Sequence, residues 1–543
     1  MVFARRSTTL LAAIIASCAM VLSLTACTSD NKTVVDGQTT VTSNSAGGVA
    51  VFTPSDGITL NQQTPLNKWA KLVPDLAKAL ADAGFKKGDI DHTTSDSLAK
   101  QSRAIQDFVV DQLSNNTTDD SGIAIAPDNM TLLVAPVVEA DASTRQYGDY
   151  VSQNLSTNDV TDEGATSDGE SSEDDSSKDD SSNTESDSTA SDEQAQAVDR
   201  LVSSLKLAKE SGMHVVLLGN SIEGYKPDAF VKFSDAQTIG KLQAEKMVSK
   251  LKLDKASKDN PKYIEVLLPY TAVDEKGNAN DSTFAQEAFR GIWQVLGSYY
   301  QKGVVESPSG TLDGKSTEND WQAVAYDAAK EGSTAKVLDK RLAKTDGQST
   351  LTRIDGIITM NDYIASEVVK ELDDLGYTGS AADINPQITI SGIVGNITGK
   401  KDLSRDAVPD PIKSPENDNA NDSSSSDDDA DEDTSASDKD RDSQWPLVTG
   451  YGAYVSNIPS IVNGKQWMTG MEDRQTIATD IAQACAKLNK DEALNSMPSI
   501  RNSEVGGVKK IPTISEPLLA VSASNLKSAL IDPGYISLAD AGL

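Results

Sequence analysis

Polar side chains follow apolar runs at several points of the chain, and the clearest example is Asn220. Residues 215–218 are Val-Val-Leu-Leu, and Gly219 and Asn220 come directly after them. Such a run is typical of a strand that is buried on both faces of a parallel sheet. Open α/β sheets bind ligands at the carboxyl ends of their strands. The Asn220 amide, which donates and accepts hydrogen bonds, is therefore a candidate ligand contact, with a turn-forming role as the alternative.

Other polar or aromatic residues stand in comparable places. Asn361 and Asp362 follow an apolar run at 354–359, and they precede a helical pattern. They are either a ligand pair or the N-cap of that helix, and one residue can do each job. Trp69 lies in a polar stretch between a strand and a helix, so it is either a stacking platform or a core residue.

Residues suited to catalysis or to metal binding are few. The chain holds two histidines, His92 and His214, without a cysteine at metal-ligand spacing, so no zinc site is expected. The acidic runs 427–429 and 431–433 lack the spaced ligands and glycine turn of a calcium loop. The motifs G-x-S-x-G, GxGxxG and the P-loop are missing from the sequence. These observations favour a protein that is not an enzyme and that uses no cofactor.

Charge is distributed unevenly over the 543 residues. The formal net charge is −33, which disfavours nucleic acid as a partner because phosphate would be repelled. Residues 156–193 carry 14 acidic and one basic residue, and residues 413–443 carry 12 acidic and three basic ones. Both segments are poor in large apolar residues, so we expect two disordered acidic insertions, at 156–194 and 413–444.

The N-terminus has the composition of a secretory leader. Arg5 and Arg6 are followed by an apolar stretch at 10–24 and then by Leu-Thr-Ala-Cys, which ends at Cys27. These four residues resemble a bacterial lipobox, which implies a signal peptide at 1–26 and lipidation of Cys27. An ordinary secretory peptide with a chance cysteine is the alternative. Residues 27–46 are polar and predict a flexible tether. We expect a monomer on the extracytoplasmic face of a bacterial membrane, held by its lipid anchor.

Beyond the tether, apolar runs and amphipathic stretches alternate. This alternation predicts an α/β protein with parallel sheets. The expected strands are residues 47–53, 130–138, 215–218, 229–233, 264–268, 303–306, 354–359, 388–391 and 445–449. The expected helices are residues 72–83, 105–113, 195–210, 284–300, 321–342, 364–375 and 476–488, with a further helix that Asp235 caps.

Several local patterns, in order over roughly 400 residues, resemble one known family. They are Lys68-Trp69 before a helix ending in Ala83-Gly84-Phe85, the strand and loop at 208–220, Phe233-Ser234-Asp235 through Gly240, the strand with Asn361-Asp362, the IPSIVNGKQ run at 458–466, and the tail with Asn525 and Asp532-Pro533-Gly534-Tyr535. Together they resemble the periplasmic sugar-binding proteins of the ribose, xylose and multiple-sugar type, which serve ABC importers with the type I solute-binding fold.

The resemblance implies two Rossmann-like lobes joined by three hinge crossings, with a sugar-like solute between them and permease subunits as partners. The lobes would span 47–233 and 234–469, with a return helix at 470–507 and a segment at 508–543 that crosses back. The residues that the resemblance places around the solute are Lys68, Trp69, Asn220, Asn280, Asp281, Phe284, Asn361, Asp362 and Tyr451, with Glu472 or Asp473 as a further possibility.

The sequence departs from this family at three of its ligand loops. Asn220-Ser221 stands where Asp-Arg is usual, Tyr451-Gly452 replaces Gln-Asp, and Glu472 replaces a basic residue. A charged hydrogen bond contributes about 1.5–3 kcal/mol, so these changes alter what is bound or how tightly. A surface lipoprotein of the same fold, acting as a solute sensor or as a docking module without transport, is the alternative function.

Overall fold

The computed structural model describes residues 46–55, 65–115, 126–138, 146–150, 153–156, 185–273, 280–328, 330–343, 351–381 and 443–543. The leader, Cys27, the tether up to residue 45, the expected strand at 388–391 and most of both acidic insertions lie outside these residues.

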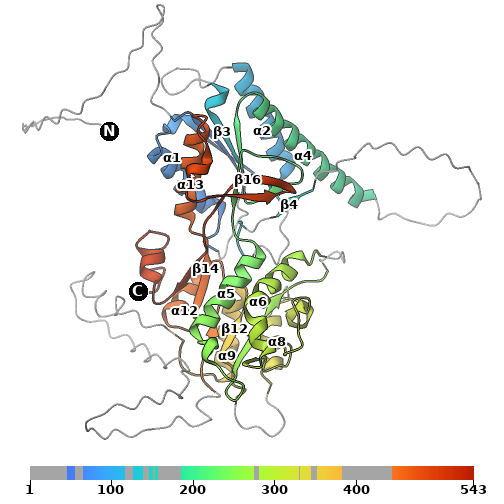
Figure 1. Cartoon of the computed structure of the whole chain (residues 1–543), viewed down its shortest axis with the longest axis vertical. Helices are drawn as coiled ribbons and strands as arrows, with labels where there is room; N and C mark the ends of the chain where they lie inside the picture. Colours follow the sequence, from blue (N-terminus) through green and yellow to red (C-terminus); the bar gives the residue numbers. More distant parts are fainter. Residues whose placement is uncertain are drawn as a thin grey trace, which may run out of the picture. The chain divides into compact units, whose positions relative to one another are not determined.

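The first lobe is built on a seven-stranded sheet with the order β15-β16-β7-β5-β3-β1-β2 (Figure 1). All neighbours are parallel except β15 and β16, which form an antiparallel pair. The strands are β1 Gly48–Pro54, β2 Ile90–Ser95, β3 Met130–Val134, β5 His214–Leu218, β7 Ala229–Lys232, β15 Ile500–Val505 and β16 Val508–Ser515. The central strands are buried on both faces, as their continuous apolar runs predict.

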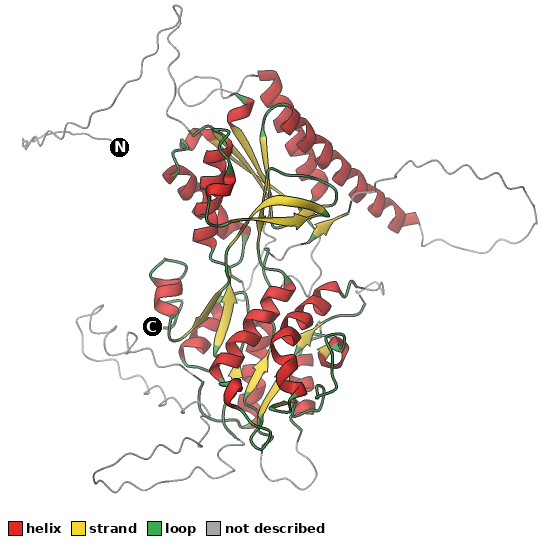
Figure 2. Cartoon of the chain, viewed as in Figure 1, coloured by secondary structure: helices red, strands yellow, loops and turns green. Residues whose placement is uncertain are grey.

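Helices cover both faces of this sheet (Figure 2). One pair, α1 and α13, packs on one apolar cluster of the lobe, and the other pair, α2 and α4, packs on a second one. These helices are α1 Trp69–Asp82, α2 Leu98–Asn115, α4 Glu185–Glu210 and α13 Arg474–Leu488. Asn489, just after α13, donates to the carbonyls of Ala46 and Gly48 and accepts from Thr131 Oγ1, so the end of this helix is hydrogen-bonded to β1 and β3.

The second lobe repeats the arrangement on a smaller scale. Its parallel sheet has the order β10-β8-β12-β13, with strands β8 Lys262–Val266, β10 Val305–Glu306, β12 Gly356–Ile358 and β13 Leu447–Val448. Its helices are α5 Ala236–Lys250, α6 Thr283–Gln301, α7 Trp321–Val324, α8 Ser333–Arg341, α9 Asp362–Leu375 and α12 Ile458–Val462. Short pairs complete the fold: β9 Leu268–Pro269 with β11 Ala325–Tyr326, and β4 Asn154–Leu155 with β6 Ser221–Ile222.

Three passages of the chain connect the lobes. The first runs from β7 through Ser234 into α5, whose N-cap is the predicted Asp235, with its side chain accepting from Thr238 N at 2.7 Å. The second runs from β14 (Met468–Met471) into α13. The third runs from β16 into β17 (Leu519–Ser522), which pairs antiparallel with β14. These three connections and the parallel strand orders confirm the two-lobed α/β fold.

Several expectations about single elements need correction. The helix expected at 321–342 is interrupted, because Ala325–Tyr326 pairs with β9 and Gly332 is left-handed at φ 70°. Helix α4 begins at Glu185, within the range expected to be a disordered insertion. Strand β2 was not foreseen, since four of its six residues are exposed and it carries no apolar alternation. The third passage follows Ser515 and not residue 507, because β16 pairs with β7 in the first sheet.

Candidate functional site

Asn361 and Asp362 follow β12, and the structure gives them different roles. Asn361 caps α9, because its Oδ1 accepts from Ile364 N at 2.9 Å. Its Nδ2 is turned the other way and donates to Gln146 Oε1, across the lobes, at 3.1 Å. Of the two roles that the sequence left open, the structure shows the N-cap at Asn361, and the free side of its amide bonds to a protein side chain from the first lobe's part of the chain.

The Asp362 carboxylate is buried inside the second lobe. It accepts from Gln466 Nε2 at 2.7 Å, Thr469 Oγ1 at 2.9 Å and Tyr454 N at 2.9 Å. Burial raises its pKa to about 6, against the lowering effect of these hydrogen bonds. Its oxygens therefore serve protein groups around β13 and β14, which is a structural role.

Lys68 and Trp69 begin α1 in the first lobe, and both contact Asp149. Lys68 Nζ lies 2.9 Å from Asp149 Oδ1, and the Trp69 backbone N–H donates to Asp149 Oδ2 at 3.0 Å. The Trp69 ring is 3% exposed and makes edge contacts with Tyr150 and Phe233, at 5.1 and 5.7 Å between ring centroids. Trp69 is thus a core residue of the first lobe, whose indole packs beside the first passage.

Asn220 lies where predicted, at the carboxyl end of β5. Its Oδ1 accepts from Gln153 N at 3.0 Å and its Nδ2 donates to the Pro136 carbonyl at 2.9 Å. The residue is only 3% exposed. The amide therefore holds two neighbouring loops together, which is why it needs both a donor and an acceptor.

The three predicted site residues near the start of α6 make different kinds of contact. Asp281 accepts from Thr283 N at 2.9 Å, and Asn280 Nδ2 donates to the Thr271 carbonyl at 2.8 Å. Phe284 instead meets Tyr147 of the first lobe, with ring centroids 4.6 Å apart. Of this group, Phe284 is the residue that contacts a side chain from the first lobe's part of the chain.

Tyr451 is completely buried at the meeting point of two passages. Its hydroxyl donates to Ser234 Oγ at 3.2 Å and lies 3.4 Å from Glu472 Oε1. Glu472 also accepts from the Ser234 N–H at 2.6 Å and from the Ser234 hydroxyl. Burial raises the pKa of the Glu472 carboxyl to about 7. The neighbouring Asp473 is the N-cap of α13 and accepts from Thr476. Glu472 therefore belongs to the hinge, whereas Asp473 caps the helix.

The sequence did not single out the segment that most of these residues touch. We call residues 146–150, Gln-Tyr-Gly-Asp-Tyr, the bridging segment. It contacts five of the nine predicted site residues, and Asn220 contacts Gln153 just beyond it. The five are Lys68, Trp69, Phe284, Asn361 and Tyr451. Two tyrosines three residues apart, in a chain with 5% aromatic residues, were the available signal.

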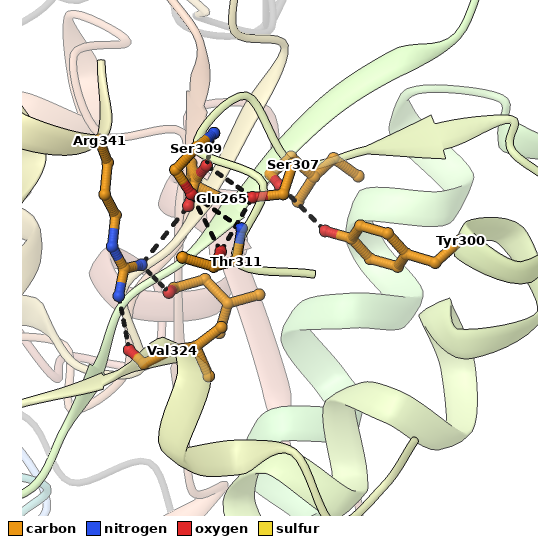
Figure 3. A network of polar contacts seen from close by, with 9 residues as sticks. Glu265, Tyr300, Ser307, Ser309, Thr311, Val324 and Arg341 are labelled. Atoms are coloured by element: carbon orange, nitrogen blue, oxygen red, sulfur yellow. Dashed lines mark hydrogen bonds and ion pairs between the residues drawn. The ribbon is translucent and has the colours of Figure 1, made fainter. Parts of the chain in front are cut away.

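A second buried polar network lies within the second lobe (Figure 3). Glu265 on β8 is 0% exposed, and its Oε1 accepts from Ser307 Oγ at 2.7 Å and Ser309 N at 2.8 Å. Arg341 Nη1 lies 3.4 Å from its other oxygen and donates to the Val266 carbonyl at 2.5 Å. Because these groups bond to one another, the network joins α8 and the loop after β10 to the sheet.

A cavity of about 750 Å³ lies at the opposite end of the first sheet from Asn220. It is lined by His214 at the start of β5, by Asp228 and Arg501, and by residues 491–495 after α13, among others. No group of three His, Cys, Asp or Glu side chains that suits a metal ion occurs among the described residues. Within the same part of the chain, no helix has the length and apolar character needed to cross a membrane.

No family model matches the chain, and no curated protein matches its sequence. Among solved structures, the chain is similar to a solute-binding protein of an ABC transporter from Clostridium phytofermentans, with bound β-D-glucose. The identity is 17%, the TM-score is 0.44, and the match covers 91% of this chain and 99% of the other. The chain is also similar to a carbohydrate transporter solute-binding protein from Chloroflexus aurantiacus, in complex with D-glucose. The identity is 18%, the TM-score is 0.44, and the match covers 92% of this chain and 98% of the other.

A periplasmic ribose ABC transporter protein from Conexibacter woesei gives 14% identity and a TM-score of 0.40, over 90% of this chain and 96% of the other. These neighbours are solute-binding proteins of ABC transporters.

Proposed function

We propose that the chain is a lipid-anchored solute-binding protein of an ABC importer, and that a carbohydrate-like solute binds between its two lobes. The observation that carries this proposal is the convergence of Lys68, Asn361, Phe284 and Tyr451, from both lobes, on one short segment. Side chains that meet across a hinge give a ligand a way to stabilise one arrangement of the lobes. The lipobox at Cys27 supports an extracytoplasmic location.

The chemistry of these residues suits a ring with polar substituents. Phe284 and Tyr451 offer aromatic surface to the apolar face of a sugar. Lys68 and the Asn361 amide offer hydrogen bonds to its polar groups. Asp362, Asn280 and Asp281 hydrogen-bond to other protein groups, so we give them a structural role near the site. The absence of the family's usual carboxylates at positions 220 and 452 argues for a solute other than a simple neutral pentose or hexose.

The test is calorimetric titration of the mature chain, with Cys27→Ser to keep it lipid-free, against mono- and oligosaccharides and their acid derivatives. At least one compound should bind, and Phe284→Ala should weaken that binding about tenfold or more, since a buried aromatic contact is lost. Tyr299→Ala on the same helix is the control, because the Tyr299 hydroxyl donates to Asp254 and its ring lies under Lys302, at the other end of α6 from Phe284. Equal affinities for all three proteins would contradict the site.

The second candidate is a sensor or envelope-docking protein without transport. It is favoured by the bridging segment, which already engages the residues that a transported solute would contact. A strain that lacks the chain separates the two functions. Loss of uptake of the bound solute supports the importer, whereas unchanged uptake supports the sensor.

A further inference from the structure

The bridging segment belongs to both lobes at once. Tyr147 is 1% exposed and lies in the apolar cluster of the second lobe, with Phe284 and Tyr451 around it. Tyr150, three residues later, is equally buried in the cluster of the first lobe. Its ring stacks on Phe233 at 4.7 Å. Five residues therefore insert one aromatic ring into each lobe.

Polar contacts fix the segment between these two rings. Asn361 Nδ2 donates to Gln146 Oε1, and the Tyr454 hydroxyl donates to the Gln146 carbonyl at 2.7 Å. The Asp149 carboxylate is bound by Lys68 and by the Trp69 N–H. The second-lobe residues thus hold Gln146 and Tyr147, and the first-lobe residues hold Asp149 and Tyr150.

Gly148 makes the close approach to the first lobe possible. Its φ is +97°, and a Cβ at this position would stand 2.6 Å from the Asn67 carbonyl oxygen. The same carbonyl accepts from Asp149 N at 2.8 Å. A backbone conformation that favours glycine, placed between two anchored tyrosines, indicates a specific docked structure.

We propose that the bridging segment is a tethered ligand, which occupies the solute site and holds the lobes together until a solute displaces it. The inference rests on the proposed function for the identity of the site. The segment offers a ring to Phe284 and Tyr451, an amide to Asn361 and a carboxylate to Lys68. A displacing solute must satisfy the same groups, so the class of solute is a sugar acid: a ring with hydroxyls and one carboxylate.

The carboxylate requirement follows from Lys68. Its side chain is 14% exposed, and Asp149 is the partner that balances its charge. A neutral sugar that removed Asp149 would leave the ammonium group partly buried without an anion, which is unfavourable. A carboxylate on the solute replaces the lost partner directly.

The first experiment measures lobe separation without any solute. Lys78→Cys on α1 and Lys340→Cys on α8 are exposed label sites for energy transfer in the Cys27→Ser mature chain, where the remaining Cys485 is buried. Replacing residues 146–150 by Gly-Gly-Ser-Gly-Gly should shift the transfer efficiency toward a larger separation. Val110→Ala, at an exposed position of α2 outside the site, is the control and should leave it at the wild-type value. An unchanged efficiency in the replacement variant overturns the proposal.

The second experiment supplies the segment in trans. The peptide acetyl-Gln-Tyr-Gly-Asp-Tyr-amide should bind the replacement variant and restore the wild-type transfer efficiency, but it should not bind the wild type. Binding to both proteins with equal affinity, or to neither, overturns the proposal. This outcome is independent of any sugar, so it separates a failure of the tethered ligand from a failure of the proposed function.

The third experiment uses glucuronate and glucose as probes. A tethered ligand that occupies about 90% of the sites lowers the apparent affinity for a competing solute about tenfold. The replacement variant should therefore bind glucuronate at least about tenfold more tightly than the wild type does. Lys68→Met in the replacement variant should remove the preference for glucuronate over glucose. A preference for glucose in the replacement variant overturns the sugar-acid assignment. Equal glucuronate affinity in wild type and variant overturns the displacement.

Discussion

At the scale of single residues, the hinge contains a buried carboxyl group, Glu472, whose surroundings disfavour its charged form. Glu472 is 1% exposed, and Ser234, Tyr451 and the nearby Asp235 face it. Burial and the charge of Asp235 both raise its pKa, to about 7 from an ordinary 4.5. The folded protein therefore binds a proton more tightly at this carboxyl group than the unfolded chain does.

The pH dependence of stability follows from that difference. Between pH 4.5 and about 7 the folded state holds the Glu472 proton and the unfolded state loses it, so the free energy of unfolding falls as the pH rises. The full effect is about 3 kcal/mol. Glu472→Gln keeps the shape without the titration, so urea unfolding should show a shallower decline for this variant. Identical slopes for both proteins between pH 5 and 7 would contradict this assignment.

At the scale of elements, the contact between α5 and α6 depends on two glycines. A Cβ on Gly240 would stand 2.2 Å from the Ala288 carbonyl oxygen, and one on Gly291 would stand 2.0 Å from the Gln237 carbonyl oxygen. Both obstacles are backbone atoms, so a side-chain rotation cannot relieve them. The two helices lie side by side (Figure 1) because neither has a side chain at the crossing point.

Gly291→Ala should therefore destabilise the protein although alanine favours helix more than glycine does. We expect a loss of about 1–3 kcal/mol from overpacking, which exceeds the gain in helix propensity. Gln294→Ala, on the exposed side of the same helix, is the control and should be nearly neutral. Denaturant midpoints measure both changes, and a stabilised Gly291→Ala variant would refute the close crossing.

At the scale of the whole molecule, each lobe has its own apolar interior. Leu201 on α4 and Leu372 on α9 are fully buried in clusters of the first and second lobes, respectively. Among the described residues, two side chains from the first lobe's part of the chain lie in clusters of the second lobe: Tyr147 of the bridging segment, and Leu66, which packs with Ile458 and Ile461 of α12. The lobes are therefore joined by passages, hydrogen bonds, the inserted Tyr147 ring and the Leu66 side chain.

Local stability should reflect this division. Leu372→Ala leaves a cavity in the second lobe and should lower the free energy of unfolding there by about 2–5 kcal/mol. Leu201→Ala should do the same in the first lobe. Hydrogen exchange followed by mass spectrometry should show faster exchange mainly in β8, β12 and α9 for Leu372→Ala, and in β3 and β5 for Leu201→Ala. Equal loss of protection in both lobes for either variant would show a single cooperative unit.

The sequence predicted the fold class, because apolar runs such as 215–218 and helical patterns such as 364–375 record which faces are buried. It also predicted the Asp235 cap, since capping depends on neighbours three residues apart. It placed Asn220 and Asn361 at the carboxyl ends of their strands for the same local reason.

Only the tertiary structure decided what these residues contact. Asn220 meets Gln153, Asn361 meets Gln146, and Lys68 meets Asp149, at separations of 67 to 215 residues. No local pattern encodes such partners, because they depend on how two sheets bring distant loops to the hinge. For the same reason the sequence did not point to residues 146–150, although in the folded chain they contact five of the nine predicted site residues.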